Sequence, residues 1–195
     1  MQKLRMISWF LMISFFLGSL SFAKPLEINE IKIIRVGLHT RIATTTIEAN
    51  GDFEVVDLEN GKVLKKITSG TSGEVTSRSG LISFQGVKGK TLHLRSLKRG
   101  MVFSVAGKRY RGEIELISQG NYFTVVEVAE LEEYLYGVLP GEMSPSWPIE
   151  ALKAQAVAAR TYALNTRGKH AKEGYDVCTT TDCQVYRGFD GEAKP

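Results

Sequence analysis

The sequence lacks the features that most readily assign a protein to a class: a strong excess of one charge, internal repeats and low-complexity linkers. Its 25 lysines and arginines nearly balance 21 aspartates and glutamates, and the formal net charge is +4 at pH 7. Nucleic-acid-binding proteins carry a marked basic excess because they neutralise phosphates, so we expect no nucleic-acid partner. The one dense basic stretch, residues 88–100, alternates like a strand with a solvated outer face; contact with an anionic polymer is the alternative.

A long hydrophobic run occurs only at the start of the chain. Lys3 and Arg5 precede an apolar run that extends to about residue 20 and is followed by Ser-Phe-Ala. This order is typical of a signal peptide, so residues 1–23 are predicted to be removed after Ala23 and the chain to be exported to the periplasm or cell wall. An uncleaved anchor is the alternative, although the run is shorter than the roughly 20 residues of a spanning helix. The rest of the chain can bury a core in one domain or two small ones.

Residues 31–128 predict an antiparallel β region, either a barrel or a sandwich. Short runs rich in Val, Ile, Thr and Phe alternate with turn residues, and Asn50-Gly51, Asn60-Gly61 and Gln119-Gly120-Asn121 are predicted to be hairpin turns. Residues 69–80 are predicted to form a polar loop. The predicted strands are IKIIRVGL (31–38), IATTTIEA (42–49), FEVVDL (53–58), KVLKKI (62–67), GLISF (80–84), TLHLRSL (91–97), MVFSVAG (101–107), YRGEIELIS (110–118) and NYFTVVEV (121–128).

This β region contains no evident site. His39 and His93 each stand alone within a strand pattern, so packing or surface placement is the expected role of both histidines.

The hydrophobic period becomes helical after residue 128. Residues 129–137 predict a short amphipathic helix that ends near Gly137 and is closed by Pro140. A second helix is predicted to follow, capped by Ser146 or Trp147 with Pro148 in its first turn. This helix is small or apolar on nearly every face, which is typical of a buried helix. The fold class predicted for the chain is therefore α+β, with an antiparallel β-rich region followed by two helices.

Three charged residues mark the helical region from 129 to 168. Glu142 lies in a Gly/Met/Pro turn before the second helix, and Lys153 and Arg160 lie seven residues apart on one face of that helix. Considered from the helix alone, the two cations are expected to form structural salt bridges, because unpaired buried charge is expensive.

These residues belong to a longer motif. LEEYLYGVLPGEMSPSWPIEALKAQAVAARTYAL (131–164) and the later YDVCTTTDCQVYRG (175–188) resemble the signature of the SpoIID/LytB domain family of cell-wall proteins. The resemblance implies a SpoIID/LytB-like domain over residues 24–195, whose C-terminal part is expected to be incomplete because the family domain continues further. It implies no cofactor.

The resemblance also implies a function. One branch of the family consists of lytic transglycosylases that cleave peptidoglycan glycan strands stripped of stem peptides, in wall remodelling or sporulation; the alternative branch consists of non-catalytic enhancers of N-acetylmuramoyl-L-alanine amidases. Carried onto this chain, the catalytic acid is Glu142. The implied substrate-binding residues are Lys153, Arg160, Gln184 and Tyr186, and for the last two a place in the core is an equal alternative.

The reaction explains why a single carboxylate would be enough. Most glycosidases use two carboxyl groups, one of which activates a water or attacks the sugar. A lytic transglycosylase lets the muramoyl C6 hydroxyl attack C1, which gives a 1,6-anhydro product without water. Glu142 would first donate a proton to the glycosidic oxygen and then accept one from that hydroxyl.

Cys178 and Cys183 are the only cysteines. In an exported protein a disulfide is the first expectation, and free thiols are the second. Some family members hold zinc near this position with an added histidine. Here Asp182 stands where relatives often have that histidine, and His170 lies eight residues before Cys178, so zinc is the third alternative and no metal ligand is assigned.

Overall fold

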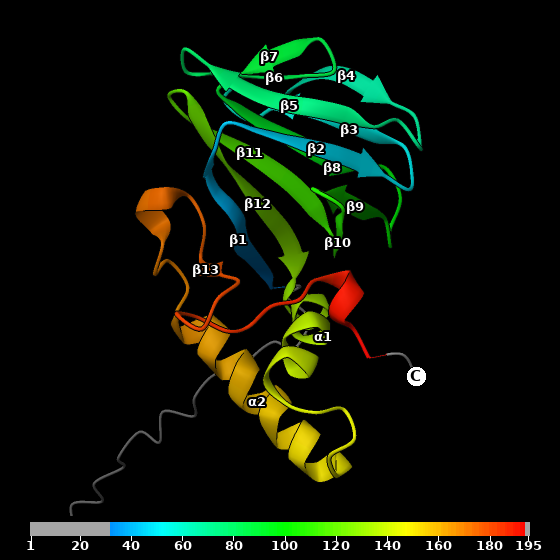
Figure 1. Cartoon of the computed structure of the whole chain (residues 1–195), viewed down its shortest axis with the longest axis vertical. Helices are drawn as coiled ribbons and strands as arrows, with labels where there is room; N and C mark the ends of the chain where they lie inside the picture. The colour runs from blue at the N-terminus through cyan, green and yellow to red at the C-terminus, as the bar shows by residue number, and fades with distance from the viewer. Residues whose placement is uncertain (1–31, 194–195) are drawn as a thin grey trace, which may run out of the picture. The chain divides into compact units, whose positions relative to one another are not determined.

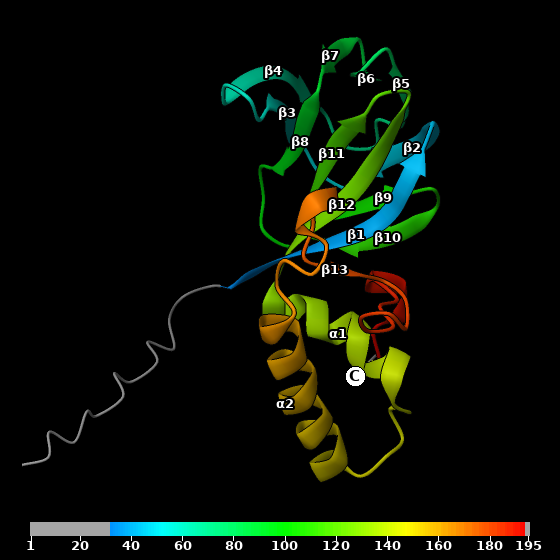
Figure 2. The same cartoon turned by 90° about the vertical axis from the view of Figure 1, so that its left-hand side faces the viewer.

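The computed structural model describes residues 32–193, and the signal peptide predicted for residues 1–23 lies outside this range. Two sheets form a β-sandwich, one of the two architectures predicted for the β region (Figures 1 and 2). The seven-stranded sheet has the order β13 (Val177–Cys178), β1 (Ile33–Ile42), β12 (Tyr122–Glu130), β11 (Glu113–Gln119), β8 (Thr91–Ser96), β3 (Phe53–Asp57) and β4 (Lys62–Ile67). The six-stranded sheet has the order β10 (Lys108–Arg111), β9 (Val102–Val105), β2 (Thr44–Ala49), β5 (Gly73–Arg78), β6 (Leu81–Phe84) and β7 (Val87–Gly89).

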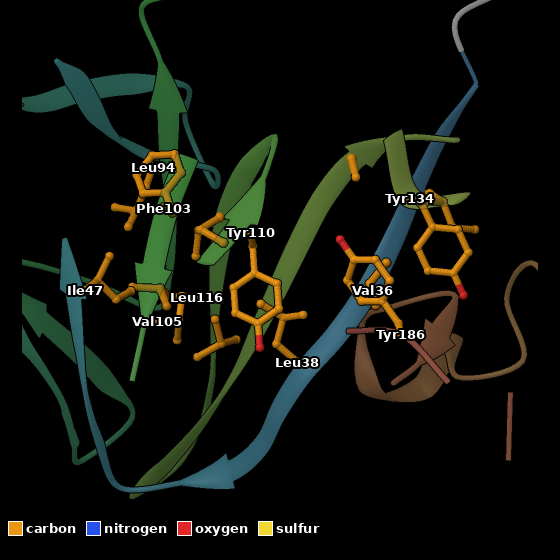
Figure 3. Packing of buried hydrophobic residues seen from close by; sticks show 14 of the residues in the cluster. Val36, Leu38, Ile47, Leu94, Phe103, Val105, Tyr110, Leu116, Tyr134 and Tyr186 are labelled. Carbon is orange, nitrogen blue, oxygen red and sulfur yellow. The ribbon is translucent and has the colours of Figure 1, made fainter. Parts of the chain in front are cut away.

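The core lies between the two sheets. Phe53 of one sheet meets Phe103 of the other edge to face, with ring centroids 5.3 Å apart, and both rings are fully buried. Figure 3 shows Leu94 and Leu116 of the first sheet beside Ile47 and Val105 of the second. Because strand side chains alternate between faces, one face of each sheet supplies these residues, which confirms the period-two patterns of the sequence.

The structure corrects the sequence-based strands at several points. The predicted loop 69–80 contains strand β5, which pairs with β2 and β6 around the buried Val75; it was missed because Val75 is its only apolar residue. Asn60-Gly61 joins the paired strands β3 and β4, as predicted, whereas Asn50-Gly51 connects β2 and β3 in different sheets and is not a hairpin turn.

A third correction concerns the run 110–118, which was predicted to be one strand. It breaks at Gly112, where the chain passes from β10 in one sheet to β11 in the other. Gly112 has φ +74°, and an added Cβ would lie 2.3 Å from the carbonyl oxygen of Val128. Only glycine suits this crossing, because the position combines a left-handed backbone with close contact to a neighbouring strand.

Helix α1 (Leu131–Glu142) continues directly from β12, and its first amide, of Leu131, donates to the carbonyl of Lys32 over 2.7 Å. The predicted end near Gly137 is wrong, because Pro140 lies inside the helix. A proline costs a helix one hydrogen bond and a steric contact, but here the last turn still closes, with the Met143 amide donating to the Leu139 carbonyl over 2.9 Å. Glu142 is therefore the last helical residue rather than part of a turn.

Helix α2 (Ile149–Asn165) packs beside α1 (Figures 1 and 2). Pro148 is its N-terminal cap residue, and no side chain caps the helix, so the predicted cap at Ser146 or Trp147 is wrong. The expectation of a buried helix is also wrong: only Ala159 and Ala163 are buried, and Ile149 is 62% exposed. Alanine fits a buried helix but also has the highest intrinsic helix propensity, so composition alone does not distinguish the two.

After α2, the short 3₁₀ helix η1 (Ala171–Glu173) leads to strand β13, which belongs to the seven-stranded sheet. A second 3₁₀ helix, η2 (Phe189–Gly191), follows β13. Strand β13 pairs in parallel with β1, placing Val177 opposite Val36 and Cys178 opposite Gly37. Between β13 and η2, residues 184–188 run along α1, and we call them the 184–188 segment. Within residues 32–193, none of the helices has both the length and the apolar character needed to cross a bilayer.

Candidate functional site

Glu142 is held at the end of α1 by a contact far away in sequence. Its Oε1 atom accepts a hydrogen bond from the backbone amide of Val185 over 2.6 Å. No partner for Oε2 is found among residues 32–193, and the residue is exposed. The carboxyl group is thus fixed through one oxygen, and the other oxygen, without a partner in the described part of the chain, is available to exchange a proton with a bound molecule.

Two glycines of α1 allow the 184–188 segment to approach so closely. A Cβ on Gly141 would lie 2.3 Å from the carbonyl oxygen of Val185, and one on Gly137 would lie 2.5 Å from the ring of Tyr186. The amide of Arg187 donates to the Gly137 carbonyl over 3.2 Å. Glycines four residues apart share one helix face, so this face of α1 is shaped for the segment that positions Glu142.

A groove with a volume of about 420 Å³ lies between α1 and α2. Leu135, Leu139 and Leu152 contribute apolar lining, and Tyr136, whose side chain is 54% exposed, lies at the groove as well. Glu142 is not among the lining residues. The complete lining consists of Arg111, Glu132, Leu135, Tyr136, Leu139, Pro140, Met143, Pro145, Leu152, Ala156, Arg160, Glu192 and Ala193.

Arg160 and Lys153 both form ion pairs. Arg160 binds Glu132 of α1 through two bonds of 2.7 Å, and hydrogen bonding to Arg160 lowers the pKa of that carboxyl group. Lys153 binds Glu150 one turn earlier over 2.9 Å. The salt bridges expected from the helix alone are therefore confirmed. Contact of either cation with a substrate stays a prediction, and it would require exchange of the present partner.

Gln184 and Tyr186 are both buried, which was one of their two predicted alternatives. The Tyr134 hydroxyl donates to Gln184 Oε1 over 3.4 Å, and the Tyr186 hydroxyl donates to Glu127 Oε1 over 3.0 Å. Figure 3 shows the rings of Tyr134 and Tyr186 close together, with centroids 4.9 Å apart. Gln184 and Tyr186 thus anchor the 184–188 segment to the core, and direct contact of either residue with a sugar would require it to become exposed.

Sequence reasoning missed Glu127 of β12, the carboxyl group beneath this segment. Glu127 is fully buried, and its Oε2 atom has no hydrogen-bond partner among the described residues. Burial raises its pKa to about 8, although the hydrogen bond from Tyr186 opposes this shift. The sequence held a signal, because Glu127 alternates with Phe123, Val125 and Ala129, which all lie in the core.

We expect Glu127→Gln to remove a pH dependence of stability. The carboxyl group ionises near 4.5 when unfolded and near 8 when folded, so the folded state holds the extra proton between these values. Native stability therefore falls as pH rises from about 4.5 to 8, by at most ~1.4 kcal/mol per pH unit from this group. Urea unfolding at several pH values should show a smaller fall in the variant. Glu48→Gln, on an exposed carboxyl, is the control; equal slopes in all three proteins would contradict the prediction.

The two cysteines are free thiols in the structure and lie in a cluster with two other potential metal ligands. Ligand atoms of His170, Cys178, Asp182 and Cys183 all lie within 4.8 Å of one another. His170 Nε2 is 3.4 Å from both Cys183 Sγ and Asp182 Oδ2. Ligands bound at about 2.0–2.3 Å in a tetrahedron are separated by roughly this distance, so the set fits zinc. His170 Nδ1 also contacts Glu173 Oε2 at 3.0 Å, which orients the ring as in many zinc sites.

The cluster is expected to bind one zinc ion per chain, through two thiolates, the imidazole and the carboxylate. Metal analysis after dialysis should show loss of the ion in Cys183→Ser and about 10–100-fold weaker binding in Glu173→Gln, whose side chain orients His170 without binding metal. Asp190→Asn is a control outside the cluster. Retention of zinc by Cys183→Ser, or a Cys178–Cys183 disulfide that blocks alkylation in purified protein, would contradict the prediction.

Comparison with known proteins gives this domain a class. Residues 119–195, which include Glu142 and the cysteine cluster, match the SpoIID family, described as stage II sporulation protein. This match supports the resemblance to the SpoIID/LytB domain family that the motif indicated. No solved structure matches it.

Three relatives are similar to parts of this chain. An uncharacterised protein of Brachyspira hyodysenteriae is 38% identical over 164 residues, which are 80% of this chain and 42% of that protein. The amidase enhancer of Bacillus subtilis is 53% identical over 55 residues, 28% of this chain and 7% of that protein. Stage II sporulation protein D of Bacillus subtilis is 42% identical over 66 residues, 32% of this chain and 19% of that protein. The matched regions thus span less than half of each relative.

Proposed function

We propose that the protein acts outside the cytoplasm on the cell wall, as a lytic transglycosylase that cleaves the bond between N-acetylmuramic acid and N-acetylglucosamine in glycan strands. The observation that carries this proposal is the setting of Glu142. One oxygen is fixed by the Val185 amide, and the other has no partner among residues 32–193 and lies at an exposed helix end. A catalytic acid requires such a setting, because its proton must be aimed at one oxygen of the substrate.

The proposed reaction needs no second carboxylate. Protonated Glu142 gives its proton to the glycosidic oxygen, the bond from that oxygen to C1 breaks, and the leaving sugar departs as an alcohol. The carboxylate then takes the proton of the muramoyl C6 hydroxyl while O6 bonds to C1. The 1,6-anhydro ring closes and Glu142 regains its proton. The amide of Val185 can hold Oε1 in both protonation states, because that oxygen is an acceptor in each.

The groove between α1 and α2 is the proposed path for the glycan strand near this acid. Sugar rings present apolar faces to aromatic side chains, and Tyr136 offers an exposed ring at the groove. Arg160 lies at the same groove and remains the proposed ligand for a sugar carbonyl or lactyl carboxylate, as does Lys153, which lies outside the lining and nearer the start of α2. Binding there would replace the Glu132 and Glu150 partners that these cations have in the structure.

A second function, enhancement of an N-acetylmuramoyl-L-alanine amidase without catalysis, is favoured by the 53% identity to a protein named amidase enhancer. One experiment separates the two. The purified protein is incubated with peptide-free glycan strands, and the products are identified by mass spectrometry. Ends carrying 1,6-anhydromuramic acid support the transglycosylase, whereas ends heavier by one water overturn it in favour of a hydrolase. No cleavage, combined with faster peptide release by a purified amidase, supports the second function.

A further inference from the structure

A second cavity, of about 370 Å³, lies where β1, β10 and the residues after β13 meet. It shares no lining residue with the groove between α1 and α2, and neither Glu142 nor the two cysteines line it. The residues that give it chemical character are His39, Lys108, Tyr110, Tyr186, Arg187 and Asp190. They come from three chain segments, so the fold rather than local sequence brings them together.

Two cations at this cavity lack partners. Neither the Lys108 nor the Arg187 side chain forms an ion pair or hydrogen bond within residues 32–193. Asp190 is the one carboxylate in the lining, but Arg109, outside the lining, already binds it through bonds of 2.9 Å from its amide and 2.6 Å from Nε. The charge available to a ligand in this cavity is therefore positive.

Neutral hydrogen-bonding groups complete the lining. His39 Nε2 is buried without a partner among the described residues, and burial and Lys108 lower the pKa of this ring. When the neutral ring carries its proton on Nε2, this atom can donate a hydrogen bond to a ligand. Tyr110 is buried, its pKa is raised to about 12 by burial, and its hydroxyl makes no hydrogen bond within residues 32–193. Figure 3 shows this hydroxyl pointing toward Leu38, another lining residue. Nε2 of His39 is thus a buried donor without an acceptor among the described residues, which is costly, and a ligand that accepts from it would remove this cost.

We propose that this cavity binds a small oxyanion, a carboxylate or phosphate group, through Lys108, Arg187, His39 and Tyr110. An anion satisfies two cations and two neutral donors at once, and a planar guanidinium suits either type of oxyanion. The cavity is larger than one such group, so the oxyanion is the charged end of a larger molecule whose remainder packs on Tyr110 and Tyr186. The proposal does not depend on catalysis by Glu142, and Glu142→Gln should bind the anion as wild type does.

The test is a titration of isotope-labelled protein with inorganic phosphate, and separately with acetate, at constant ionic strength. Shifts of backbone amide resonances should concentrate at His39, Lys108 and Arg187. Lys108→Gln and Arg187→Gln should each weaken binding at least ~10-fold, because each removes a charge-assisted hydrogen bond. Both side chains are exposed, so neither change should affect folding. Lys62→Gln removes the same charge from an exposed lysine of β4 and should leave binding unchanged.

The outcomes are distinct. Localised shifts that weaken in both cavity variants but not in Lys62→Gln support the site. Tighter binding of phosphate than of acetate indicates a phosphate-bearing ligand, and the reverse order indicates a carboxylate. Shifts that spread over the surface, or that weaken equally in Lys62→Gln, would show only general attraction of anions and overturn the proposal, as would an absence of shifts.

Discussion

Glu142→Gln is expected to lower the rate of formation of 1,6-anhydromuramoyl ends by about 10²–10⁴-fold, the usual contribution of a general acid. Glutamine keeps the size of the side chain and an oxygen that can accept from the Val185 amide, so the fold around the site should be preserved. What it lacks is an acidic proton. The product is counted by mass spectrometry after digestion of peptide-free glycan strands, and thermal unfolding is measured alongside.

Glu150→Gln is the matched control for this change. Glu150 is an exposed carboxylate at the start of α2, eight residues after Glu142, and it pairs with Lys153. Its replacement tests whether loss of any nearby negative charge lowers activity, and it should retain most of the rate. If Glu142→Gln still produced anhydro ends at a rate near that of wild type, another group would have to be the acid.

The β-sandwich was largely predictable because most strands have one buried face, and burial of one face produces the alternation that the sequence displays. Strand β5 shows where this reasoning ends. Strand β5 is held by hydrogen bonds to β2 and β6, and its other residues are polar or glycine. Val75 is therefore the only residue whose apolar character indicates that the strand is partly buried. Similarly, residues 110–118 were predicted to be one strand that includes Gly112, since nothing local shows that the chain changes sheets there.

The helices show the limits of local signals in another way. Pro140 indicates a helix end by its own chemistry, yet α1 continues through it to Glu142. The alanines of α2 indicate burial by their size, yet Ala159 and Ala163 are the only buried residues of α2 within the described part of the chain. In both cases the neighbouring elements decide the outcome, and their positions are a property of the whole fold.

The candidate site was likewise predictable only in part. Glu142, Lys153 and Arg160 could be singled out because they lie within one motif, and His170 with the cysteines was at least a candidate for zinc. The contact between Glu142 and Val185 spans 43 residues of sequence and depends on how the 184–188 segment crosses α1. The same is true of the cavity at Lys108 and Arg187. Long-range contacts of this type leave no periodic trace in the sequence.

Gly141→Ala tests whether this crossing positions the acid. In an ordinary helix position the change stabilises by about 1 kcal/mol, because alanine has the higher helix propensity. Here the new Cβ would lie 2.3 Å from the Val185 carbonyl oxygen, a backbone atom that can move only with the 184–188 segment. Overpacking of this kind usually costs about 1–3 kcal/mol, so we expect destabilisation where propensity alone predicts a gain. Displacement of Val185 should also release Glu142 and lower the cleavage rate at temperatures where the variant remains folded.

Two further variants separate this contact from general helix effects. Ala158→Gly, at an exposed position of α2, should cost about 1 kcal/mol in urea unfolding and leave cleavage nearly unchanged. Val185→Ala combined with Gly141→Ala should not restore stability, because the closest atom belongs to the backbone and not to the valine side chain, whose nearest atom would be 3.3 Å away. If Gly141→Ala were instead more stable than wild type and equally active, the close approach of the segment would not be what holds Glu142 in place.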